Sequence, residues 1–166
     1  MLLPRDTQAY TDPMWANIWK TKIHERLKIF LWRLSSNTLP TKTNLASRFG
    51  MESVLCPLCH LEDESYSHLF LNCSKVKPIW FRLNWSLHSE RLPLVSGADF
   101  LKFVINPPIS LACSLDLKLI KELTTIHLAL ALECIWNLRN QAMHNAQKIN
   151  LFAVLTNLDL RIREHC

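Results

Sequence analysis

Glycine is nearly absent from this chain, which has two glycines among 166 residues. Folds built from many short strands need tight turns, and glycine supplies the positive φ angles of those turns. Because 49% of the residues are hydrophobic, the chain can bury a core, which argues against intrinsic disorder. The composition therefore predicts a mainly α-helical fold, in which the eight prolines mark the boundaries between helices.

A hydrophobic run long enough to cross a bilayer is also missing. The most apolar stretch, 126–138, contains His127 and Glu133, whereas a membrane helix needs about 20 consecutive apolar residues. At the N-terminus, Pro4 and Arg5 follow three residues, so no signal-peptide core is formed. We therefore expect an intracellular protein with no signal peptide and no membrane partner.

The chain does contain cysteines at the spacing of metal ligands. Cys56-Pro57-Leu58-Cys59 is followed by His68 and Cys73, a Cys-x2-Cys-x8-His-x4-Cys pattern. In a reducing compartment, this pattern is typical of metal binding rather than of a disulfide framework. Three thiolates and one imidazole complete a tetrahedral Zn²⁺ site, and a site with no open position is structural. The alternative is three unrelated cysteines near an incidental histidine.

We therefore predict one structural Zn²⁺ with Cys56, Cys59, His68 and Cys73 as its ligands. The step from His68 to Cys73 is about one helical turn plus one residue, so both ligands are expected to project from a short helix that begins near Tyr66. The other three cysteines stand singly and lack ligand spacing: Cys113, Cys134 and Cys166.

Apolar residues at three- and four-residue steps predict a succession of helices. The first covers Trp15 to Ser35, and the segment Leu39-Pro40-Thr41 breaks the helical pattern after it. Thr41 or Thr43 is the expected N-cap of the next helix, which extends to Phe49 and ends at Gly50. The remaining expected helices cover 75–87, 99–105, 114–145 (with Ser114 as its N-cap) and 150–163.

Positive charge is concentrated before the cysteines. Residues 15–50 contain seven Lys or Arg and one acidic residue. The metal loop, in contrast, contains acidic residues but no Lys or Arg. If the chain contacts RNA or DNA, we expect non-specific, salt-sensitive phosphate contacts through these basic side chains. The alternative is an ordinary solvated helix face. The seven candidate residues are Lys20, Lys22, Arg26, Lys28, Arg33, Lys42 and Arg48.

The segments that flank the cysteines occur in a distinctive order. They are Ile18-Trp19-Lys20, residues 28–34 (Lys-Ile-Phe-Leu-Trp-Arg-Leu), Leu39-Pro40-Thr41, Asn44-Leu45, Glu64-Ser65, His68-Leu69-Phe70 and Ile79-Trp80. Together with the ligand pattern they resemble the zinc-binding domain of plant LINE-type (non-LTR retrotransposon) reverse transcriptases. This resemblance covers about Trp15 to Phe81 and implies the same four zinc ligands.

A second, less complete resemblance lies further along the chain. Trp136 with Arg139-Asn140 is similar to the signature of the spacer that follows this domain in such polyproteins, although His144 stands where an aromatic residue is usual. In those elements the zinc domain follows the polymerase and often precedes an RNase H domain. The resemblance implies that this chain is a fragment or a degenerate copy of a larger element protein.

The catalytic groups of those neighbouring enzymes are not expected here. Polymerase chemistry needs clustered carboxylates that hold two metal ions, and the fourteen acidic residues of this chain are scattered. Tyr10-Thr11-Asp12-Pro13 has a superficial likeness to the polymerase Tyr-x-Asp-Asp motif, but Pro13 replaces the second aspartate. The sequence therefore predicts a protein that is not an enzyme.

The expected organisation is a loose tail (1–14), a small zinc-stapled helical domain (15–88) and a helical C-terminal spacer or bundle (89–166). We expect a non-catalytic structural zinc module of a retrotransposon reverse transcriptase-like protein that contacts RNA or DNA through its basic helix. The alternative is a spacer that packs against polymerase or RNase H domains of the same polyprotein without binding nucleic acid. The resemblance slightly favours the nucleus over the cytoplasm.

Overall fold

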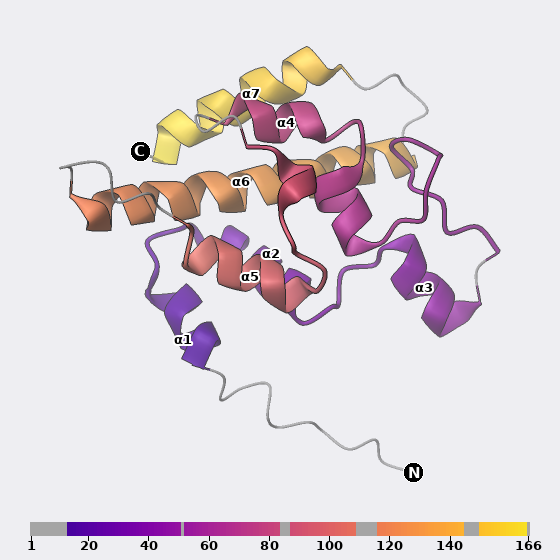
Figure 1. The fold of residues 1–166 in the computed structure, drawn as a ribbon, viewed down its shortest axis with the longest axis horizontal. Helices are drawn as coiled ribbons and strands as arrows, with labels where there is room; N and C mark the ends of the chain where they lie inside the picture. The colour runs from indigo at the N-terminus through magenta and orange to yellow at the C-terminus, as the bar shows by residue number, and fades with distance from the viewer. Residues whose placement is uncertain (1–12, 51, 84–86, 109–115, 145–149, 166) are drawn as a thin grey trace, which may run out of the picture.

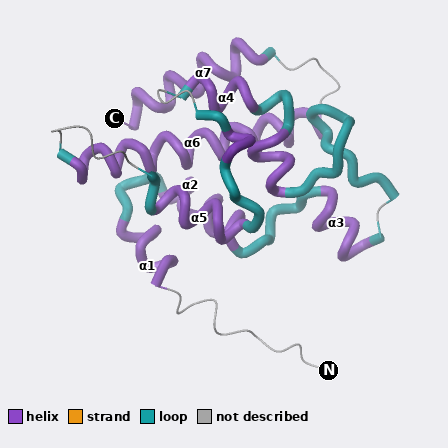
Figure 2. Tube along the Cα trace, in the orientation of Figure 1, coloured by secondary structure: helices purple, strands orange, loops and turns teal. Residues whose placement is uncertain are grey.

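The structure, a computed structural model, describes residues 13–50, 52–83, 87–108, 116–144 and 150–165 (Figure 1). Within these ranges the regular structure is helical, and the β-type pairing is a single bridge between Leu55 and Asp63 (Figure 2). The helices are α1 (Pro13–Lys20), α2 (Glu25–Ser35), α3 (Lys42–Phe49), the π-helix η2 (His68–Asn72), α4 (Lys77–Arg82), the 3-10 helix η3 (Ser89–Arg91), α5 (Gly97–Ile105), α6 (Leu117–His144) and α7 (Leu151–His165). The mainly α prediction is confirmed.

Helix α6 forms the centre of the fold. It contacts α2, α5, η2, α4 and α7, and Figure 1 shows α4 and α7 on one side of it and α2 and α5 on the other. All residues from Thr124 to Glu133 are buried. A helix that is apolar on all sides must be surrounded by other elements, so the middle of α6 is the core around which the shorter helices pack.

The first predicted helix is two helices in the structure. Helix α1 begins at Pro13, a favourable first position because proline has no N–H to leave unpaired, and it ends at Lys20. His24 starts α2, since its backbone is extended (ψ 143°) and its Nδ1 accepts a hydrogen bond from Arg26 N at 3.1 Å. An apolar pattern runs through both helices, but the histidine cap interrupts the backbone between them.

Helices α2 and α5 are packed with very little space between their backbones. A Cβ atom on Gly97 would lie 2.0 Å from the carbonyl oxygen of Leu34, so glycine is required where α5 begins against the end of α2. Ser96 and Asp99 cap this end of α5 reciprocally, in a capping box. The end of the N-terminal helix pair is thereby joined to the C-terminal half of the chain.

Buried apolar residues from both halves of the chain form one hydrophobic cluster. Leu31 of α2, Phe70 of η2, Phe100 of α5 and Leu130 of α6 are all members, with exposures of 1% or less. The ring centroids of Phe70 and Phe100 lie 5.5 Å apart, with the ring planes tilted by 59°. The residues before and after the predicted boundary at 88 therefore share a core, and the division at that boundary remains a prediction.

The other predicted helices differ from the observed ones mainly at their ends. Thr41 is the N-cap of α3, and Gly50 ends that helix in the left-handed conformation (φ 69°), as expected. The predicted cap Ser114 lies outside the described residues, as does the predicted tail before Pro13. Among the described residues, we found no helix with the length and apolar character needed to span a membrane.

Candidate metal centre

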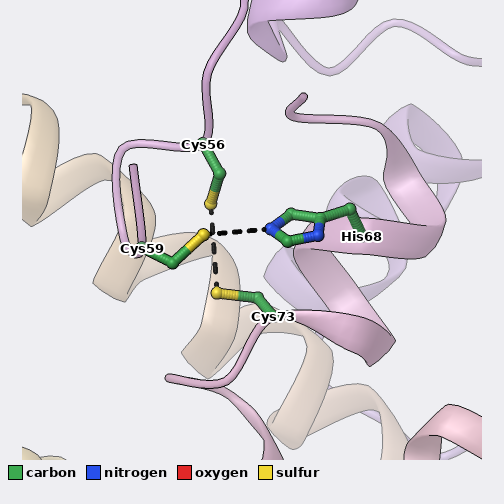
Figure 3. Close-up of side chains that lie close together, drawn as sticks. All are labelled: Cys56, Cys59, His68 and Cys73. Atoms are coloured by element: carbon green, nitrogen blue, oxygen red, sulfur yellow. Dashed lines mark hydrogen bonds between the residues drawn. The ribbon is translucent and has the colours of Figure 1, made fainter. Parts of the chain in front are cut away.

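The four predicted ligands meet at one point (Figure 3). Cys56 Sγ lies 4.0 Å from Cys73 Sγ, and Cys59 Sγ lies 3.3 Å from His68 Nε2. All four ligand atoms lie within 4.8 Å of one another. Around tetrahedral Zn²⁺, with Zn–S near 2.3 Å and Zn–N near 2.0 Å, sulfurs are about 3.8 Å apart and sulfur and nitrogen about 3.5 Å apart. The donor set and its spacing fit zinc.

A closed backbone loop presents the first two cysteines. Cys56 N donates to Glu62 O at 2.7 Å, and Glu64 N donates to Val54 O at 2.8 Å, which ties the two ends of the loop together. Inside the loop, His60 N donates to Cys56 O at 2.9 Å, and His60 itself has a positive φ of 58°. This tight turn places both thiols on its inner side, where Cys56 is fully buried.

The second ligand pair comes from a π-helical turn. In an α-helix, two residues five positions apart differ by about 140° in direction, so they do not face one ligand. In η2, Cys73 N donates to His68 O at 2.8 Å, which is the five-residue hydrogen bond of a π-helix. This bond brings His68 and Cys73 to the same side of the helix. The short helix near Tyr66 was predicted, but its π-type winding was not.

Side chains from later elements hold this π-turn in place. The indole Nε1 of Trp80 donates to the carbonyl oxygen of Phe70 at 2.6 Å, and Ser89 Oγ donates to that of Leu71 at 2.6 Å. Both bonds are buried. A buried carbonyl without a donor is costly, so Trp80 and Ser89 stabilise the winding that aligns the two ligands.

Glu62 contacts one of the candidate ligands, a contact that the sequence did not predict. Its carboxylate lies 3.1 Å from Nδ1 of His68, and a proton shared on that side leaves Nε2 of the ring as the metal-binding atom. Carboxylates of this kind orient ligating histidines and raise their basicity. The sequence places Glu62 between the two ligand pairs, but its position alone does not indicate a contact with His68.

The two buried sulfurs also interact directly. The hydrogen bond between them lowers the pKa of the Cys56 thiol to about 5 and raises that of Cys73, because the pair retains one proton between them. Zinc ligation requires thiolates and displaces this proton. When bound, the ion would be held by Cys56, Cys59, His68 and Cys73, and it would supply a crosslink between the loop and η2.

A buried ion pair connects the metal loop to the central helix. Arg139 of α6 donates from Nε to Glu64 Oε1 at 2.6 Å and from Nη2 to Glu64 Oε2 at 3.0 Å. The same Nη2 donates to the carbonyl oxygen of Pro40 at 2.9 Å, and Glu64 Oε2 accepts from Lys42 N at 2.6 Å. Glu64 thus pairs with α6 while it also accepts a backbone N–H at the start of α3.

The seven basic candidates are in different environments. Lys22 pairs with Glu122, and Arg26 pairs with the buried carboxylate of Glu133. Lys42 is half-buried at the start of α3, whereas the remaining exposed candidates form no ion pair within the described residues: Lys20, Arg33 and Arg48. Intramolecular contacts therefore occupy part of the predicted basic surface.

Lys28 differs from the expected outer position. Its side chain is 8% exposed, and its Nζ donates to Trp19 O at 3.2 Å and to Glu25 Oε1 at 2.9 Å. Because the chain turns between α1 and α2, the ammonium group of Lys28 reaches a carbonyl that the last turn of α1 leaves unpaired. Lys28 is therefore not on the exposed face where a phosphate contact was predicted.

Comparison with known proteins agrees with this geometry. Residues 3–80 match the family model described as zinc-binding in reverse transcriptase. The chain is also 30% identical over 66 residues to an Arabidopsis thaliana protein named "Putative ribonuclease H protein"; this match spans 40% of the chain and 11% of that relative. No solved structure shows a significant match. The predicted resemblance to a zinc-binding domain of reverse transcriptases is therefore confirmed over residues 3–80.

Proposed function

We propose that this chain is a non-catalytic structural module that holds one Zn²⁺ in a retrotransposon reverse transcriptase-like protein. The observation that carries the proposal is the convergence of four protein ligands on one point. Four protein ligands leave no position for water or substrate, which is the mark of a structural rather than a catalytic zinc site.

The metal would stabilise more than its own loop. Glu64 lies five residues after Cys59 and pairs with Arg139 of α6, while Trp80 and Ser89 hold the π-turn that carries His68 and Cys73. Order at the zinc site is thus connected to α4, η3 and α6 by buried hydrogen bonds. Structural zinc contributes on the order of 10 kcal/mol to the folding of such segments.

Chelation tests this structural role. Titration of the purified chain with a strong chelator should reduce both the far-ultraviolet helical signal and the melting temperature, and added Zn²⁺ should restore them. If the chelated, metal-free chain keeps the same melting temperature, the ion has no structural role and the proposal fails.

The module has two candidate partners: RNA or DNA, and the polymerase or RNase H domains of the same polyprotein. Contact with RNA or DNA is supported by the excess of basic residues before the metal loop, several of which are exposed. Packing against polymerase or RNase H domains is the second candidate, but the apolar middle of α6 is already buried within this chain between Thr124 and Glu133. We therefore place nucleic-acid contact first.

Salt-dependent binding distinguishes the two candidates. Labelled single-stranded RNA and DNA should bind the zinc-loaded chain at low salt, with affinity that falls steeply as salt rises. Absence of binding at low salt, by a chain whose zinc content is intact, would favour the packing role.

A further inference from the structure

A cleft at the end of the molecule where α6 begins is lined by four lysines. The cleft has a volume of about 480 Å³, and its lining residues come from the end of α1 and the turn that follows it, the end of α5 and the first turns of α6. Figure 1 shows these three segments at the same end of the fold. Lys20 and Lys22 come from the first wall, and Lys118 and Lys121 come from α6. Residues about 100 positions apart thus bring like charges to one hollow.

The charges of this cleft are incompletely compensated. Glu122 is the acidic residue among its lining side chains, and it pairs with Lys22 at 3.3 Å in an exposed ion pair, a kind worth little. Lys121 donates to the amide oxygen of Asn106 at 3.0 Å. This bond orients the ammonium group, but its neutral acceptor does not compensate the positive charge. Lys20 and Lys118 form no ion pair within the described residues.

The floor of the cleft is apolar. Ile23, Ile105 and Ile126 line it, and each is less than 8% exposed. A site with lysines around aliphatic side chains suits a ligand that has phosphates beside a less polar part. A nucleic-acid strand has this character, since its sugars and bases alternate with phosphodiesters.

We propose that this four-lysine cleft binds the phosphates of single-stranded nucleic acid. The choice of nucleic acid over other phosphate ligands rests on the proposed function, whereas the location rests on the cleft itself. The cleft differs from the basic helix face predicted from the sequence. Two of its lysines, Lys118 and Lys121, belong to α6, whereas Arg33 and Arg48 of the predicted face do not line it.

Matched charge reversals separate the cleft from the predicted face. Lys118→Glu with Lys121→Glu changes the charge by the same amount as Arg33→Glu with Arg48→Glu, and all four side chains are exposed. Anisotropy of a labelled single-stranded oligonucleotide should show at least a tenfold loss of affinity for the first pair and less than a threefold change for the second. The slope of log affinity against log salt should fall by about 1.4 for two lost phosphate contacts.

Two further arms complete the test. Lys20→Glu with Lys22→Glu, on the opposite wall, should weaken binding as much as the α6 pair does. Equal losses in the cleft and control variants, or a loss confined to the control, would overturn the proposal, as would displacement of the strand by a free nucleoside triphosphate at equal phosphate concentration. Zinc content measured on every variant keeps the result separate from the proposed function, which fails if zinc is absent.

Discussion

The guanidinium of Arg139 and the carboxylate of Glu64 form a two-point ion pair across 75 residues of sequence, with both side chains buried. Arg139 lies over the ring of Trp136 at 4.9 Å and also binds the carbonyl of Pro40. Glu64 and Arg139 belong to sequence signatures that lie far apart in the chain. Their ion pair, called the joint below, connects the metal loop, the start of α3 and the central helix α6.

Loss of this joint should destabilise the whole chain. Arg139→Met leaves the buried Glu64 carboxylate without its cation, and breaking a buried pair costs about 3 to 5 kcal/mol. Urea unfolding of the zinc-loaded protein would measure this as a lower midpoint. The exposed Arg163→Met is the matched control and should change the free energy of unfolding by less than about 0.5 kcal/mol.

A double-mutant cycle tests whether the two side chains act as a pair. Glu64→Leu with Arg139→Met should cost less than the sum of the two single changes, because the second change removes the uncompensated charge left by the first. If the cost of the double variant equals the sum of the two single costs, Glu64 and Arg139 have no coupling energy and do not act as a pair.

Glu62 should tune the zinc affinity without being a ligand. Glu62→Gln removes the charge beside Nδ1 of His68, and changes of this kind reduce metal affinity about 10- to 100-fold. Competition with a chromophoric chelator measures the effect. Glu52→Gln, at an exposed position before the metal loop, should leave the affinity unchanged; an equal loss in both variants would point to general electrostatics instead.

Gly97 should be required by the contact between α2 and α5. Its replacement by alanine forces a methyl group against Leu34 O, and overpacking of this kind costs about 1 to 3 kcal/mol. Thermal unfolding should show a lower melting temperature for Gly97→Ala. Gly50→Asn is the control, since asparagine tolerates the left-handed backbone and nothing lies within 4 Å of the added Cβ. A wild-type melting temperature for Gly97→Ala would contradict the close approach.

The ligand set could be predicted from the sequence because zinc imposes both residue types and spacing on a short segment. The winding of η2 could not, since the π-type bond from Cys73 to His68 depends on Trp80 and Ser89, which bind the carbonyls of that turn. Local periodicity contains no information about such distant donors.

The joint and the cleft were beyond prediction for a related reason. Glu64 and Arg139 were each recognised within a signature, but nothing in the sequence states that they meet. Lys118 and Lys121 lie about 100 residues from Lys20 and Lys22 in the sequence, and their proximity depends on how the chain after α1 folds against the start of α6. The burial of Lys28 could not be predicted either, because it follows from the break between α1 and α2 at His24.

Metal analysis of the purified chain tests whether the Cys56, Cys59, His68 and Cys73 cluster holds a structural zinc ion. Wild-type protein, Cys56→Ser and Cys73→Ser should be compared by elemental analysis together with circular dichroism. We expect one zinc per chain in the wild type and loss of zinc, with loss of helical structure, in both variants. A wild-type chain that is folded and free of metal would contradict this expectation.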